Sequence, residues 1–221
     1  MLDAIEFETG PEPQTSLIVL HGLGADGRDF EPVCQALQLQ ALGDVRFVLP
    51  HAPERPVTLN GGYRMPAWFD ILGPHPAPAE DEAGLRAAQA QIAALLDREV
   101  ARGVPARRIV LMGFSQGCAM TLMTALRYPA RLGGAVGLSG YLPLAGRTAA
   151  ERSAANADLP LFLAHGRQDG IVIPARGRAS RDTLQALGYA VDWHEYDMDH
   201  SVSLEELQDL NAWLLRQLSM A

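Results

Sequence analysis

A serine between two glycines is the first group in this chain whose setting suggests covalent chemistry. Residues 113–117 read Gly-Phe-Ser-Gln-Gly and directly follow the apolar run 108–112. A strand, a sharp turn and a helix beginning near Gln116 would form a nucleophile elbow, in which the serine hydroxyl projects clear of the sheet. The glycines allow a turn too tight for side chains, and Ser115 is expected in a strained conformation. This short motif is informative because of its place between a strand and a helix.

A serine hydroxyl attacks a carbonyl efficiently only when a base removes its proton and an acid orients that base. In the fold that carries such an elbow, the acid and then the histidine follow the serine along the chain. Asp169 comes just after the apolar strand predicted at 159–164, on the same edge of the sheet as Ser115. His200 lies in a loop before the last predicted helix, from which it can reach the serine. These positions predict a triad of Ser115, Asp169 and His200.

The two other histidines in the second half of the chain fit structural roles better. His165 ends the strand that leads to Asp169, and His194 lies within a predicted strand. Asp197 and Asp199 are the next candidates for the acid if Asp169 proves dispensable.

The negative charge that develops on a carbonyl oxygen under attack is stabilised by backbone N–H donors. One candidate is the N–H of Gln116, the residue after the serine. The turn at 21–24 (His-Gly-Leu-Gly), which follows the apolar run 17–20, offers the N–H of Leu23 as the second. His21 precedes this donor and is expected to buttress the loop rather than act as the base.

The rest of the sequence predicts a scaffold that brings strand ends together. Apolar runs and amphipathic helices alternate, which indicates an α/β fold with a mostly parallel sheet and helices on both faces. Ligands are then expected beyond the carboxyl ends of the strands. Helices are predicted at 82–103, 116–128 and 203–219, and the second is apolar nearly all round and should be buried. The predicted strands are 16–20, 45–49, 108–112, 134–139, 159–164 and 190–196.

Two segments interrupt this alternation. Residues 50–80 are rich in proline and glycine, and residues 141–158 are mostly small and polar. Long loops in compact domains are commonly covers over a site, so we expect the segment at about 50–80 to lie over the active site. No internal repeat or composition shift marks a second domain, and we predict a single domain over residues 1–221.

Composition excludes several classes of function. The 221-residue chain has a net charge of −8 and no run of basic residues, which argues against nucleic acid or an anionic membrane as partner. All 18 basic residues are arginines, which excludes lysine nucleophiles. Cys34 and Cys118 form no disulfide framework, and Cys118 is expected to be a small buried side chain. Without a signal-peptide pattern or an apolar stretch of ~20 residues, we expect a cytoplasmic protein with no stable membrane insertion.

Four ordered motifs resemble the phospholipase/carboxylesterase family of α/β-hydrolases, which includes bacterial carboxylesterases and acyl-protein thioesterases. They are His-Gly-Leu-Gly-Ala-Asp-Gly at 21–27, the serine motif at 113–117, His-Gly-x-x-Asp at 165–169 and His-Ser at 200–201. The segment 65–71 (Met-Pro-Ala-Trp-Phe-Asp-Ile) also resembles the family's Trp-aromatic-Asp loop. The resemblance runs over nearly the whole chain.

The resemblance implies the triad and the two oxyanion donors named above, an acyl-serine intermediate, and no metal or organic cofactor. It also makes a homodimer a candidate assembly, because family members are often reported as dimers. A substrate channel bordered by residues 60–72 is implied as well, and the apolar side chains of this region suggest a trough for an acyl chain. The alternative for Trp68 and Phe69 is that they anchor the loop in the core. The candidate substrate-binding residues are Leu59, Met65, Trp68, Phe69 and Ile71.

The leading hypothesis is a serine carboxylesterase that hydrolyses short- to medium-chain acyl esters. Acyl-protein thioesterase and lysophospholipase activities stay open, because their substrates present the same carbonyl to the same triad. A peptidase, a lactonase or a non-catalytic binding protein on a hydrolase scaffold are further alternatives, since a fold does not fix a function.

One position departs from the family pattern, in which a small or apolar residue often precedes the histidine. Here that residue is Asp199. A carboxylate so close is expected to favour protonated His200 and to move the acid limb of activity to higher pH.

Overall fold

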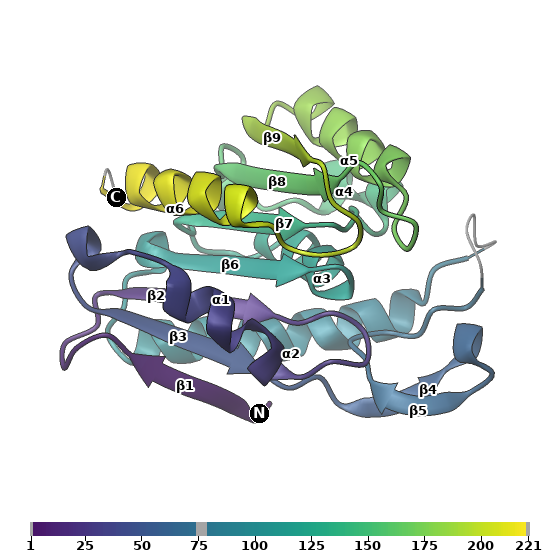
Figure 1. Ribbon diagram of the computed structural model, residues 1–221, viewed down its shortest axis with the longest axis horizontal. Coiled ribbons are helices and arrows are strands. Elements are labelled where there is room, and N and C mark those ends of the chain that lie inside the picture. Colours follow the sequence, from purple (N-terminus) through teal and green to yellow (C-terminus); the bar gives the residue numbers. More distant parts are fainter. Residues whose placement is uncertain (1, 74–78, 220–221) are drawn as a thin grey trace.

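A seven-stranded sheet with the order β1-β3-β2-β6-β7-β8-β9 forms the centre of the computed structural model (Figure 1), which describes residues 2–73 and 79–219. The edge strand β1 (Ala4–Glu8) runs antiparallel to β3, and the other neighbouring pairs in this sheet are parallel. The parallel strands are β2 (Thr15–Leu20), β3 (Val45–Pro50), β6 (Ile109–Phe114), β7 (Gly134–Leu138), β8 (Leu161–Gly166) and β9 (Val191–Tyr196).

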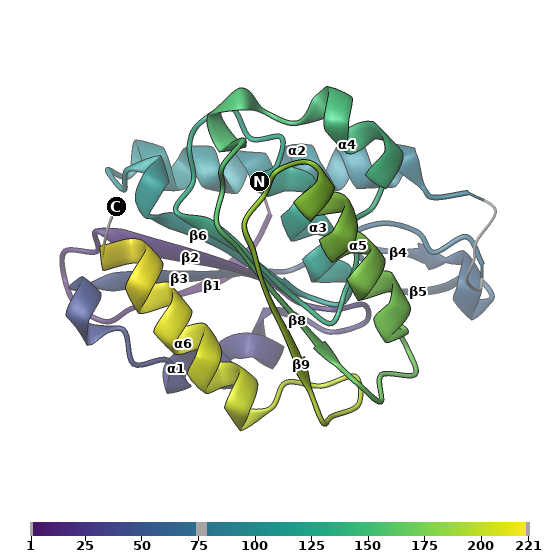
Figure 2. The same ribbon diagram turned by 90° about the horizontal axis from the view of Figure 1, so that it is seen from above.

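Helices cover both faces of this sheet (Figure 2). The helices α1 and α6 lie on one face, and α2, α3, α4 and α5 lie on the other. Their bounds are α1 (Glu31–Ala36), α2 (Glu82–Ala101), α3 (Gln116–Ala125), α4 (Ala145–Glu151), α5 (Pro174–Ala186) and α6 (Leu204–Ser219).

The central strands supply apolar side chains to both layers of the core. In β2, Leu17 and Val19 pack in the layer under α6, whereas Ile18 and Leu20 pack in the layer under α2 and α3. Successive side chains of a strand point to opposite faces, so a strand covered on both sides must be apolar at every position. This explains the continuous apolar runs of the sequence and confirms the predicted mostly parallel α/β sheet.

All six predicted strands are present, with ends that differ by at most two residues. The prediction missed β1, whose sequence Ala-Ile-Glu-Phe-Glu alternates because this edge strand is only half-buried. It also missed α1, α4 and α5. The first two are short, and α5 carries so many polar residues that little apolar periodicity marks it.

The predicted helices are present with shorter ends. The helix after the serine is buried along its whole length, as predicted, but it ends at Ala125 rather than 128. Two apolar side chains of the helices predicted at 82–103 and 203–219 are exposed rather than packed on the sheet: Val100 is 42% exposed and Leu204 is 79% exposed. Both lie at the ends of their helices, where fewer neighbouring elements cover the surface. Among the described helices, none is both long and apolar enough to cross a membrane.

The two segments expected to be loops contain regular structure. Within 50–80, β4 (Glu54–Val57) and β5 (Tyr63–Pro66) form an antiparallel hairpin that makes a second, two-stranded sheet. It lies at the end of the molecule toward which the parallel strands point (Figure 1). Residues 74–78 of the predicted loop lie outside the described residues. The segment 141–158 contains α4 and a short 3-10 helix, Ala154–Asn156.

Candidate active site

The serine motif forms a strained turn between β6 and α3. Ser115 has φ 56° and ψ −116°, and its N–H donates to the Leu138 carbonyl of β7 at 2.8 Å. A Cβ at Gly113 would collide with the carbonyl of Gly117, and a Cβ at Gly117 would collide with the carbonyl of Leu20. Glycine is therefore required at both positions, as the elbow interpretation predicts.

The three predicted triad residues lie in one hydrogen-bonded chain. The His200 Nε2 atom is 2.9 Å from the Ser115 hydroxyl, and the His200 Nδ1 atom is 2.7 Å from Asp169 Oδ2. The carboxylate can only accept, so Nδ1 carries the proton and Nε2 is left to accept the serine proton. Asp169 is buried, and its other oxygen accepts the backbone N–H groups of Ile171 and Val172, each at 2.9 Å. The acid is thus held by its own loop.

His165 lies beside this chain but has a structural role. Its Nε2 donates to the Val172 carbonyl at 2.7 Å and lies 3.3 Å from Asp169 Oδ2. Burial lowers the pKa of His165, so the ring is neutral near pH 7 and leaves Asp169 available as a charged partner for His200.

His21 supports the turn that carries the second predicted oxyanion donor. The ring is fully buried, and burial lowers its pKa. Its Nδ1 donates to the Gly22 carbonyl at 2.7 Å, while its Nε2 accepts the Ala52 N–H at 3.0 Å. Gly24, with φ 77°, donates its N–H to Pro66 at 2.8 Å. These contacts fix the turn at both ends. Both ring nitrogens of His21 are engaged within the turn, so His21 is a structural residue and not the base.

The two residues predicted to supply the oxyanion donors, Leu23 and Gln116, both line the cavity that opens at Ser115. Gln116 is the first residue of α3, so its N–H has no acceptor within the helix and lies at the positive end of the helix dipole. This arrangement suits an oxygen that gains negative charge beside Ser115.

The cavity at Ser115 has a volume of about 290 Å³ and a mostly apolar wall. Three of the five predicted substrate-binding residues line it: Leu59, Phe69 and Ile71. Met65 is not among the lining residues; its sulfur accepts a hydrogen bond from Asn60 instead. Asn60, which lies within the predicted channel border 60–72, also lines the cavity. The sequence prediction missed four wall residues outside that region, which are Tyr141, Ile171, Val172 and Arg176.

Trp68 is a correction to the sequence prediction. Its side chain is fully buried, and its Nε1 donates to the His21 carbonyl at 2.9 Å. The amide side chain of Gln116 accepts the Trp68 backbone N–H at 2.7 Å and donates to the Phe69 carbonyl at 2.8 Å. Trp68 therefore anchors the loop in the core, which was the stated alternative. The anchoring role of Gln116 was missed, although a polar residue at the start of an otherwise apolar helix was a signal for it.

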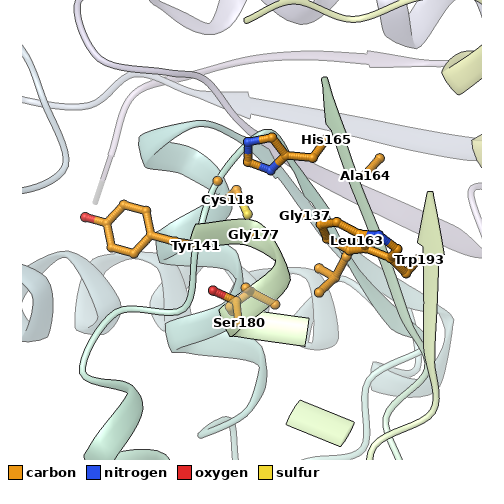
Figure 3. Close-up of a pocket in the computed structure, with 11 residues that line it drawn as sticks. Cys118, Gly137, Tyr141, Leu163, Ala164, His165, Gly177, Ser180 and Trp193 are labelled. Atoms are coloured by element: carbon orange, nitrogen blue, oxygen red, sulfur yellow. The ribbon is translucent and has the colours of Figure 1, made fainter. Parts of the chain in front are cut away.

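A second cavity, lined by His165 and Trp193 among other residues, has a volume of about 10 Å³ and is too small for a substrate (Figure 3). Its wall includes Cys118, whose buried thiol has its pKa raised to about 12 by desolvation. Such a thiol is neither ionised nor nucleophilic near pH 7, and the predicted role as a small buried side chain is confirmed. Within residues 2–73 and 79–219, no cluster of three or more His, Cys, Asp or Glu side chains could hold a metal ion.

Comparison with known proteins agrees with this geometry. The family model described as Phospholipase/Carboxylesterase matches residues 3–217. The chain belongs to this family. It is 41% identical over 204 residues to acyl-protein thioesterase 1 of Yarrowia lipolytica, covering 90% of each chain. It is 37% identical to a probable carboxylesterase of Oryza sativa subsp. japonica, covering 90% of this chain and 76% of that protein. The crystal structure of Arabidopsis thaliana SOBER1 superposes with a TM-score of 0.87, at 32% identity, over 92% of this chain and 99% of the other.

As a member of the phospholipase/carboxylesterase family, the protein is a serine hydrolase with the α/β-hydrolase fold. Three of the four missed wall residues of this hydrolase follow strands that were predicted from the sequence. Tyr141 comes after β7, and Ile171 and Val172 come just after Asp169 in the loop beyond β8. Their proximity to the carboxyl ends of parallel strands was the available signal. Arg176 had no such signal, because it lies on the unpredicted helix α5.

Proposed function

We propose that this phospholipase/carboxylesterase family member is a serine carboxylesterase that hydrolyses short- to medium-chain acyl esters. The observation that carries the proposal is the continuous chain of hydrogen bonds from Ser115 through His200 to Asp169. Ser115, at one end of this chain, lines an apolar cavity. A binding protein would have no need to hold a serine in a strained backbone conformation beside a correctly oriented histidine.

The proposed reaction has two halves. His200 Nε2 takes the hydroxyl proton as Ser115 Oγ bonds to the ester carbonyl carbon, and the oxyanion is stabilised by the N–H groups of Leu23 and Gln116. The protonated His200, stabilised by Asp169, then gives this proton to the leaving alkoxide as the C–O bond breaks. Water attacks the acyl-serine with His200 again as base, which releases the carboxylic acid and restores the serine.

The cavity volume supports the proposed chain length. About 290 Å³ lies near the lower end of the range for small-molecule pockets, about 300–1,000 Å³. A short or medium acyl chain fits such a space against Leu59, Phe69 and Ile71, and a long chain would extend into solvent. Activity against esters should therefore fall once the acyl chain exceeds the depth of this cavity.

A thioesterase is the second candidate, and a specific observation favours it. Several relatives at 38–41% identity are named acyl-protein thioesterase 1. A thioester presents the same carbonyl to Ser115, and the thiolate is a better leaving group than an alkoxide. The triad and the cavity serve both substrates, so a matched ester and thioester of one acyl chain are needed to separate the two activities.

The test is initial-rate hydrolysis of p-nitrophenyl esters from acetate to palmitate, with Ser115→Ala as the blank. We expect a maximum at a short or medium chain length and loss of activity in the variant. Matched thioesters, lysophospholipids and amides of the preferred acyl chain then rank the leaving groups, and slow amide turnover beside fast ester turnover excludes a peptidase. A wild-type rate that never exceeds the Ser115→Ala rate would contradict the proposal and favour a binding protein.

A further inference from the structure

One charged side chain lies in the otherwise apolar wall of the active-site cavity. Arg176, in the first turn of α5, is the one charged residue among the described residues that line this space. An arginine keeps its positive charge at any pH that the enzyme meets. The substrate cavity therefore carries a fixed positive charge opposite residues such as Leu59 and Phe69, which neither donate nor accept hydrogen bonds through their side chains.

Within residues 2–73 and 79–219, no carboxylate lies within ion-pairing distance of Arg176. Its guanidinium contacts the ring of Tyr141 instead. Arg178, two residues further along the same helix, shows the contrast. Its guanidinium donates to both oxygens of Glu195, each at 2.8 Å, and this pairing lowers the pKa of Glu195 to about 2. The charge of Arg178 is thus matched within the protein, and the charge of Arg176 is left for a ligand.

The guanidinium of Arg176 is also held in place. Its Cζ atom lies 3.5 Å from the centroid of the Tyr141 ring, a face-on stack that is a favourable cation–π contact. The backbone on either side of this stack is tied together. The Leu142 N–H donates to Ser180 Oγ at 2.8 Å, and Ser180 Oγ donates to the Arg176 carbonyl at 2.8 Å. Figure 3 labels Tyr141 and Ser180 and shows the helical segment that carries Ser180 close to the loop that carries Tyr141.

A guanidinium carries several N–H donors, and those that Tyr141 does not engage match the two oxygens of a carboxylate in their geometry. Arg176 is half-buried, and a ligand that fills the cavity would remove water from its charge, which costs free energy unless a partner of opposite charge accompanies it. A substrate that brings its own carboxylate would supply that partner, whereas a neutral acyl chain would leave the guanidinium facing apolar atoms.

We propose that Arg176 is a specificity-determining residue that selects acyl esters or thioesters carrying a carboxylate, such as half-esters of dicarboxylic acids. The carboxylate would be bound by the guanidinium edge while the reacting carbonyl lies at Ser115. This proposal rests on the proposed hydrolase function and names its substrate class. It also predicts that the enzyme accepts such anions despite its own net charge of −8, because the local positive charge lies inside the site.

The test compares two substrates that differ only in charge: mono-p-nitrophenyl adipate and its methyl ester. In the wild-type enzyme we expect kcat/KM to be higher for the charged substrate. Arg176→Gln should lower the ratio of charged to neutral kcat/KM by about tenfold or more, since it removes a charge-assisted hydrogen bond. Arg176→Lys, which keeps the charge without the planar fork, should restore part of the ratio.

Arg178→Gln is the matched control, because it removes the same charge from the same helix outside the cavity. Its ratio should stay within about twofold of the wild-type ratio, a change that corresponds to little binding free energy. In the wild type, the preference for the charged substrate should also weaken between 50 mM and 1 M NaCl, and Arg176→Gln should show no such dependence. Thermal unfolding of each variant establishes that it is folded.

An unchanged ratio in Arg176→Gln would overturn the proposal, and so would an equal loss on both substrates, which would make Arg176 a structural residue. Failure of the proposed hydrolase function would give a result distinct from both of these. In that case the wild-type enzyme would hydrolyse neither substrate faster than Ser115→Ala does.

Discussion

The two sides of the active site are built differently. On the catalytic side, the sheet and its loops hold the reacting residues: the Arg167 N–H donates to Tyr196 at 2.8 Å, and the Gln168 N–H donates to Met198 at 3.1 Å. These bonds tie the loop of Asp169 to the loop of His200. On the substrate side, the β4–β5 hairpin belongs to a separate two-stranded sheet, and its Tyr63 is 69% exposed.

Side chains supply part of the support on the substrate side, in addition to backbone bonds such as the one from the Leu59 N–H to the Ile71 carbonyl at 2.8 Å. The Gln116 amide binds the backbone of Trp68 and Phe69, and the Asp70 carboxylate accepts from both the N–H and the hydroxyl of Thr58. Backbone pairing fixes atoms regardless of side-chain identity, whereas these attachments depend on single residues. Catalytic geometry should therefore tolerate changes in the substrate wall, whereas acyl specificity should respond to them.

The largest expected effect is on the catalytic side. Ser115→Ala removes the only atom that forms the acyl-enzyme, and kcat should fall on the order of 10⁶-fold. Because the sheet and α3 hold the turn, the fold should survive the loss of one hydroxyl. Steady-state kinetics with the preferred p-nitrophenyl ester measures the rate, and circular dichroism checks the fold. A variant with more than a few per cent of wild-type activity would exclude Ser115 as the nucleophile.

The second-largest loss of kcat is expected for Asp169→Asn. The amide that faces His200 Nδ1 can donate as well as accept, so it permits the wrong tautomer of the ring, and kcat should fall on the order of 10⁴-fold. Nearly full activity would mean that Asp169 is not the acid. Asp197 and Asp199 would then be replaced in turn; the structure pairs Asp197 with Arg167 at 3.0 Å, away from His200.

Gln116→Met should distinguish the two sides of the site, because it should impair hydrolysis of medium-chain esters more than hydrolysis of the acetate ester. It keeps the backbone N–H beside Ser115 but removes the amide that binds Trp68 and Phe69, leaving a buried N–H and a buried carbonyl unsatisfied. We expect kcat/KM for a medium-chain ester to fall roughly tenfold, the order set by loss of a buried hydrogen bond. The acetate ester should be less affected, because its acyl chain makes little contact with the wall that contains Phe69.

The control for this prediction is Gln35→Met on α1, on the opposite face of the sheet. Gln35 is exposed and its side chain binds only Glu31 among the described residues, so this variant should behave as wild type. If Gln116→Met lowered acetate and medium-chain turnover equally, the amide would serve the catalytic side, and the proposed division of the site would be wrong.

The same division explains what the sequence could predict. Ser115, Asp169 and His200 follow apolar strands, and strand ends of a parallel sheet converge, so their chain order alone indicates that they meet. The strands themselves were evident because both of their faces are covered. Trp68 could not be placed, since an aromatic residue in a Pro/Gly-rich segment serves equally well as a cavity wall or as a core anchor. Arg176 was missed because the polar sequence of α5 hides the helix, and only the folded chain brings its first turn beside Tyr141.

The smallest expected effect concerns Asp199, the residue that departs from the family pattern. Its side chain is exposed, so water and salt screen its charge, and the charge acts on His200 only weakly. A negative charge favours protonated imidazole. Removing it with Asp199→Gly should therefore move the acid limb of the kcat/KM profile to lower pH at low salt.

The charge and the change of backbone can be separated with Asp199→Glu, which should leave the acid limb where it is. At 1 M NaCl, where the screening length is about 3 Å, the wild-type and Asp199→Gly profiles should coincide. A shift that persists at high salt would indicate that glycine alters the His200 loop rather than its electrostatics. The absence of any shift at low salt would mean that the charge of Asp199 does not influence the base, and this expectation would be wrong.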